Sequence, residues 1–102
     1  MMTAGEYAKY TLDNLCRATL ANAFNISSKI DVQGCYTFKD FATGLKDYAI
    51  LRLQQTNSDL YYGIITTINK HIKLYDSSIS CNKRLLIDDL IIDLWTLINE
   101  DK

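Results

Sequence analysis

The sequence feature that most restricts the fold is the apolar run at residues 85–98, LLIDDLIIDLWTLI. On a helical wheel, its large aliphatic residues form a central stripe with further apolar residues on both flanks. The stripe consists of Ile87, Ile91, Leu94 and Ile98, and the flanks consist of Leu86, Leu90, Leu97 and Trp95. Because this apolar arc covers roughly half of the circumference, we expect this helix to be the one against which the others pack.

Length and composition favour one helical domain. A chain of 102 residues is long enough for one hydrophobic core, which predicts a single domain over residues 1–102. Apolar residues make up 48% and charged residues 23%, as in ordinary globular proteins. The sequence has no proline, the strongest helix breaker, so helices are permitted along almost its whole length.

Capping signals and helical spacing predict three helices before the apolar run. Thr3 and Glu6 form a capping box, which predicts a helix over about residues 4–24. Thr37 with Asp40 predicts a second helix to about residue 55, and Asp59 starts a third that continues to about residue 75. Ser80 or Asn82 would cap the last helix. Short connections make sequential helices antiparallel, so we expect an all-α fold, a small antiparallel helical bundle of about four helices.

Residues 25–36 leave an alternative open. Their asparagine, serine and glycine residues favour a loop, yet Ile30, Val32, Tyr36 and Phe38 alternate at the period of a strand. The alternative fold is therefore α+β, with a short hairpin around residues 29–38. We favour the loop because Gly34 interrupts the alternation and no second strand is evident.

Two polar residues interrupt apolar faces. Arg52 falls within the apolar stripe of its helix, either with its head group reaching solvent or paired with a carboxylate of a neighbouring helix. His71 lies at the edge of the next stripe, where spacing ties no second titratable residue to it. We interpret it as a hydrogen-bonded boundary residue rather than a ligand or base.

The sequence predicts a soluble, cytoplasmic protein without a metal or other cofactor. The N-terminus lacks the features of a signal peptide, and three aspartates interrupt the longest apolar run, so no membrane span is expected. Cys16, Cys35 and Cys81 are odd in number and widely spaced, which fits reduced thiols. Three scattered cysteines and one histidine also lack the paired spacing of a zinc site.

No motif indicates an enzyme. Asp88, Asp89 and Asp93 form a carboxylate cluster, but a solvated helical face supplies neither a metal nor the separated pKa values that acid–base catalysis needs. The four glycines are isolated, so no phosphate-binding loop is present. A net charge of −1 disfavours nucleic-acid binding. Even so, a nucleic-acid-binding or transcription-regulatory protein remains the alternative function.

We therefore expect a protein that acts by contact with another protein. Small helical proteins of this kind include inhibitors, immunity proteins and adaptor modules, such as the accessory proteins of phages and plasmids. Apolar side chains on the polar arc of the last helix, framed by aspartates, predict the binding surface. The predicted contact residues are Leu85, Asp88, Asp89, Ile92 and Asp93, with Tyr62 of the preceding helix as an aromatic anchor. The partner is another protein or a second copy of this chain.

Overall fold

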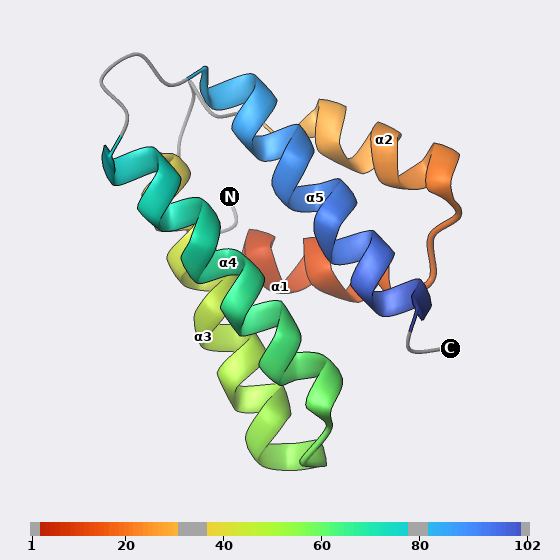
Figure 1. Cartoon of the computed structure of the whole chain (residues 1–102). Helices are drawn as coiled ribbons and strands as arrows, with labels where there is room; N and C mark the ends of the chain where they lie inside the picture. The colour runs from red at the N-terminus through yellow and green to blue at the C-terminus, as the bar shows by residue number, and fades with distance from the viewer. Residues whose placement is uncertain (1–2, 31–36, 78–81, 101–102) are drawn as a thin grey trace.

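The computed structural model describes residues 3–30, 37–77 and 82–100. In these ranges the chain is helical, which confirms the predicted all-α class, but it forms five helices rather than about four. They are α1 (Ala4–Leu15), α2 (Leu20–Lys29), α3 (Phe38–Thr56), α4 (Asp59–Ser77) and α5 (Lys83–Glu100) (Figure 1).

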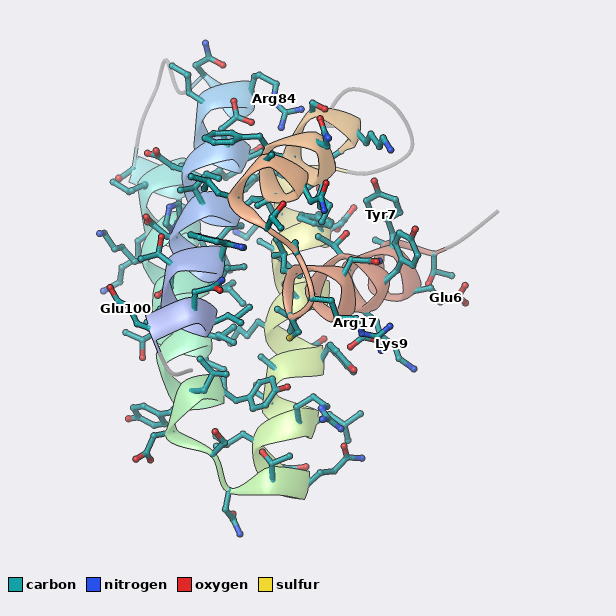
Figure 2. All side chains as sticks on the ribbon, turned by 90° about the vertical axis from the view of Figure 1, so that its right-hand side faces the viewer. Glu6, Tyr7, Lys9, Arg17, Arg84 and Glu100 are labelled. Atoms are coloured by element: carbon teal, nitrogen blue, oxygen red, sulfur yellow. The ribbon has the colours of Figure 1, made fainter. Side chains whose placement is uncertain are left out.

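The helices do not form a simple up-and-down bundle. α3 and α4 are a long antiparallel pair joined by a short connection, and α5 packs against α4 (Figure 1). α2 lies beside α5, whereas α1 packs on α3 and crosses it (Figures 1 and 2). The predicted antiparallel order of neighbours therefore holds for α3 with α4 and for α4 with α5, but it fails at the N-terminal end of the chain.

The predicted helix starts are confirmed where a local cap defines them. The Oγ1 atom of Thr3 accepts a hydrogen bond from the Glu6 amide at 3.1 Å, and that of Thr37 accepts from the Asp40 amide at 3.0 Å. Asn82 caps α5, because its Oδ1 accepts from the amide of Arg84 at 3.0 Å. These bonds satisfy first-turn donors that have no partner inside the helix.

The prediction of one helix over residues 4–24 is wrong. α1 and α2 are separated by residues 16–19. Thr19 is exposed and caps α2 by accepting from the Asn22 amide at 3.2 Å. Trp95 of α5 donates from Nε1 to the Ala18 carbonyl at 2.8 Å, which satisfies an acceptor in the break. The break allows α2 to pack on α5 while α1 packs on α3.

Part of the segment at residues 25–36, which we expected to be a loop, is helical. Residues 25–29 belong to α2, and Ile30 is buried directly after it. The alternative hairpin around residues 29–38 lies mainly on residues 31–36, which are outside the described residues. At its edges, Lys29 and Phe38 are both helical.

The apolar stripe of α5 is buried at the centre of the fold, as predicted. Its buried residues pack with the inward faces of the other helices into one cluster. The α5 members are Leu86, Ile87, Leu90, Ile91, Leu94 and Ile98, and the largest partners are Leu12, Leu15, Phe38, Phe41, Leu45, Ile64 and Ile68. Burial of these apolar groups is the main stabilising contribution.

α1 and α3 approach closely because small residues meet at their crossing. A Cβ atom on Gly44 of α3 would lie 3.1 Å from both the Ala8 Cβ and the Gly5 Cα. One turn further along, the Tyr48 hydroxyl donates to Asp13 Oδ1 at 2.7 Å. Burial, together with this hydrogen bond and the negative charge of Asp13, raises the pKa of Tyr48 to about 12.

Arg52 does not pair with a carboxylate among the described residues. Its guanidinium contacts Gln55 Oε1 at 3.1 Å and the Tyr61 hydroxyl at 3.5 Å, and it lies 5.7 Å from the centre of the Tyr61 ring. Arg52 is half-buried, and its head group reaches from α3 to Tyr61 of α4 while staying partly in solvent. Of the two interpretations from the sequence, the contacts favour the first.

Candidate functional site

The predicted contact surface on α5 is only partly free. Leu85 is 63% exposed, and Asp89 is also exposed. Asp88, in contrast, accepts a hydrogen bond from Ser27 of α2, and Ile92 is half-buried against the core. The helical wheel placed both residues on the solvent-exposed arc of this helix. It could not account for α2, because residues 20–24 were predicted to continue the first helix.

Asp88 belongs to an intramolecular network with Arg84 and Ser27. Arg84 Nη2 donates to Asp88 Oδ1 at 2.9 Å and to Ser27 Oγ at 3.0 Å, and Ser27 Oγ donates to Asp88 Oδ1. The guanidinium also donates to the carbonyl oxygens of Ser27 and Ile30 at the end of α2. A cation at this position satisfies terminal carbonyls and complements the helix dipole. The network fixes the C-terminal end of α2 to the first turn of α5.

Ile92 is half-buried and packs against the core, which corrects its predicted exposure. Ser27 contacts Asp88, and Ala18 contacts Trp95, so α2 and α5 run antiparallel. In this register Phe24, one turn before Ser27, lies level with Ile92, one turn after Asp88.

Two exposed apolar residues of α2 therefore extend the predicted surface. Leu20 and Phe24 share one face of α2 at i,i+4, and Phe24 is 54% exposed. We define the α2–α5 surface as Leu20, Phe24, Leu85 and Ile92. The sequence contained a signal for the first two, because both fall opposite the inward face of their helix. What it did not show was that they lie beside α5.

Tyr62 does not join this surface. It is 67% exposed on α4, but the first turn of α4 meets the last turn of α5, where Gly63 and Leu97 line one pocket. Leu85 lies at the opposite end of α5, about 18 Å from Leu97 along the axis. The predicted aromatic anchor is thus separated from the apolar residues that it was expected to accompany.

Asp93 points to the other side of α5, toward α4. Its Oδ2 lies 3.5 Å from Nε2 of His71, whose side chain is only 2% exposed. The Nδ1 atom of His71 is 2.9 Å from the Thr67 carbonyl and donates to it, because a carbonyl can only accept. His71 is thus a buried residue and not a boundary residue. Its titratable neighbour, Asp93, belongs to another helix, so the residue spacing within one helix could not reveal it.

A groove between α1 and α2 is a further feature that the sequence did not predict. The two helices diverge after the break, leaving an open cavity of about 330 Å³. One face of each helix lines it at helical spacing, with side chains that are mostly polar, aromatic or cationic. The lining residues with such side chains are Tyr7, Tyr10, Thr11, Asn14, Arg17, Asn22, Asn25 and Lys29.

The described residues include no group of three or more histidine, cysteine or acidic side chains arranged to hold a metal ion. Over the same residues, every helix is too short or too polar to cross a membrane. Among the described residues, the α2–α5 surface and the α1–α2 groove are two candidate surfaces for contact.

Known proteins add no assignment to this geometry. Comparison of the chain with models of protein families, with curated protein sequences and with solved structures finds no match.

Proposed function

We propose that this protein acts without catalysis, by binding another protein through the α2–α5 surface. The observation that carries the proposal is the exposure of Phe24 and Leu85 on adjacent helices, together with exposed Leu20 and half-buried Ile92 on the same two helices. Scattered exposed apolar residues are common, but several that share one face of two helices are typical of an interaction site.

The surface is held in shape before any partner arrives. Arg84 ties the end of α2 to α5, and Trp95 ties the segment before α2 to the same helix. A surface fixed by such contacts loses little conformational freedom on binding, which favours affinity. This rigidity supports a docking role for the pair of helices.

The charges near the surface suggest which partner face would fit. Asp89 is exposed on α5, and Asp88 retains part of its carboxylate exposure although it pairs with Arg84. An apolar partner face bordered by lysine or arginine would complement this rim. Within this proposal, the protein is an inhibitor, immunity or adaptor type of module, and a heterologous partner is favoured over a second copy of the chain.

The experiment introduces charge into the surface without disturbing the core. Phe24→Glu and Leu85→Glu change exposed side chains, whereas Ile92→Glu would also disturb partly buried packing. Leu74→Glu is the matched control, because Leu74 is 46% exposed and lines a groove along α4 rather than the α2–α5 surface. Each tagged protein is used to capture partners from the cells that produce it, and light scattering reports its oligomeric state.

We expect the first two variants to lose a partner that the parent and Leu74→Glu retain, with thermal midpoints close to the parent. Capture that is unaffected by Phe24→Glu and Leu85→Glu would refute the assigned surface. A dimer of the parent that both variants dissociate would instead identify a second copy as the partner.

A further inference from the structure

The α1–α2 groove is lined by polar, aromatic and cationic side chains that take no part in the proposed protein contact on the α2–α5 surface. It occupies a different face of α2, where Asn22, Asn25 and Lys29 replace the apolar Leu20 and Phe24. Its volume of about 330 Å³ falls within the range of sites for small organic ligands. The groove can therefore be considered as a second, independent site.

Positive charge lies at both ends of the groove. Arg17 precedes the first turn of α2 and Lys29 is its last residue; both are exposed, and none of the described lining residues is acidic. The ten residues of α2 span about 15 Å. The two cations are thus too far apart to hold one phosphate, and they suit an extended ligand with an anionic group at each end.

Aromatic and amide groups lie between these charges. The Tyr7 hydroxyl donates to the Lys29 carbonyl at 3.3 Å, and its ring packs 5.9 Å from that of Phe41, so Tyr7 forms a fixed wall toward α2 (Figure 2). Tyr10 is 56% exposed and leaves a ring available at the rim. The side-chain amides of Asn22 and Asn25 lie on the opposite wall.

We propose that the α1–α2 groove binds a short single strand of nucleic acid. One base stacks on the exposed ring of Tyr10, and phosphates on either side pair with Arg17 and Lys29. The asparagine amides meet the base edge, since an amide offers both a donor and an acceptor. An acidic peptide would satisfy the cations but not the tyrosine ring, and a single nucleotide would reach only one cation. The overall charge of −1 disfavours nucleic-acid binding in general, but binding of a short single strand depends on the local charge of the groove.

The test measures fluorescence anisotropy of a labelled, short oligothymidylate titrated with the intact chain at several ionic strengths. We expect a dissociation constant of about 10⁻⁴ to 10⁻⁶ M. Two phosphate contacts predict a slope of log affinity against log salt of about −1.4, and Arg17→Gln should reduce its magnitude by about 0.7. Tyr10→Ala should weaken binding about 5- to 150-fold through loss of stacking, whereas Tyr10→Phe should retain it.

Tyr62→Ala is the matched control, because Tyr62 is also an exposed tyrosine, on another helix. It should leave affinity unchanged, and circular dichroism should show unchanged thermal midpoints for all variants. If Tyr10→Ala unfolds, the salt slope of Arg17→Gln still decides the question. No binding at low ionic strength, or equal weakening by Tyr62→Ala, would overturn the proposal. The proposal would also be overturned if thymidine monophosphate or polyglutamate competed as effectively as unlabelled oligothymidylate.

Discussion

Two glycines in the middle of helices should respond to the same substitution with opposite signs. Gly44 of α3 lies at the crossing with α1, where an added Cβ would sit 3.1 Å from Ala8 Cβ and Gly5 Cα and 3.3 Å from the Ala4 carbonyl oxygen. Gly63 of α4 faces only the flexible end of Leu97, and an added Cβ would lie 3.7 Å from its Cδ2. The first site has no room for a methyl group, whereas the second has ordinary contact distances.

The expected magnitudes follow from these distances. Replacing a mid-helix glycine by alanine stabilises the folded state by about 0.5–1 kcal/mol, because the unfolded chain loses freedom and the helix gains propensity. Gly63→Ala should show this full gain. At Gly44 the neighbouring atoms are backbone and Cβ atoms that cannot rotate away, and overpacking of this kind costs about 1–3 kcal/mol. Gly44→Ala should therefore be less stable than the parent by about 1 kcal/mol.

Urea unfolding followed by far-UV circular dichroism measures both changes in one assay. For a chain of this size, a change of 1 kcal/mol corresponds to a shift of about 4–8 °C in the thermal midpoint, which scanning calorimetry would also resolve. If Gly44→Ala stabilises the protein as much as Gly63→Ala does, then α1 does not approach α3 at this crossing, and the reasoning fails.

Four further outcomes are expected. Ile91→Ala should lower the free energy of unfolding by about 2–5 kcal/mol in urea melts, because Ile91 is fully buried in the α5 stripe; an unchanged midpoint would contradict this. Arg84→Met should cost about 2–3 kcal/mol, because it removes three hydrogen bonds that join α5 to the end of α2 and a fourth to Asp88 within α5, whereas Lys39→Met should cost less than about 1 kcal/mol, because the ion pair of Lys39 is exposed; equal losses would refute the role of the network. With its pKa raised from 10.0 to about 12, native Tyr48 retains a proton that the unfolded chain loses. The protonated Tyr48 hydroxyl contributes about 1 kcal/mol to the free energy of unfolding after solvent screening. This contribution is complete below pH 10 and is lost toward pH 12, so the melts of the parent and of Tyr48→Phe should converge over that interval. Arg52→Met should change neither stability nor its salt dependence appreciably, because the guanidinium pairs with no carboxylate among the described residues; a salt-dependent loss in melts at low and high salt would indicate a missed ion pair.

The sequence was sufficient for features that neighbouring residues decide. Thr3 and Thr37 start their helices as predicted, because a cap requires only the hydroxyl and an amide three residues later. The stripe containing Ile91 and Leu94 is buried as predicted, because the angular spacing of apolar residues determines which face of a helix turns inward. The all-α class follows from the same two local rules.

Only part of the candidate surface was predicted correctly, because only part of it depends on the spacing of residues within one helix. Leu85 is exposed on α5 as the wheel indicated, but Ile92 is half-buried and Asp88 pairs with Arg84. A wheel shows which residues share a face, and it does not show which other helix covers that face. Tyr62 was grouped with Leu85 on the assumption that they lie near each other, and the antiparallel packing of α4 and α5 separates them.

The remaining features depend on contacts between residues far apart in the chain, which only the tertiary structure decided. The break before Thr19 is stabilised by Trp95, 77 positions after the carbonyl that accepts its hydrogen bond. Arg84 holds α2 from 54 and 57 positions away, and His71 finds Asp93 on another helix. The α1–α2 groove exists because those distant contacts draw α2 toward α5 and away from α1. Local propensity favoured a continuous helix over these residues, and burial and hydrogen bonding against α5 outweighed it.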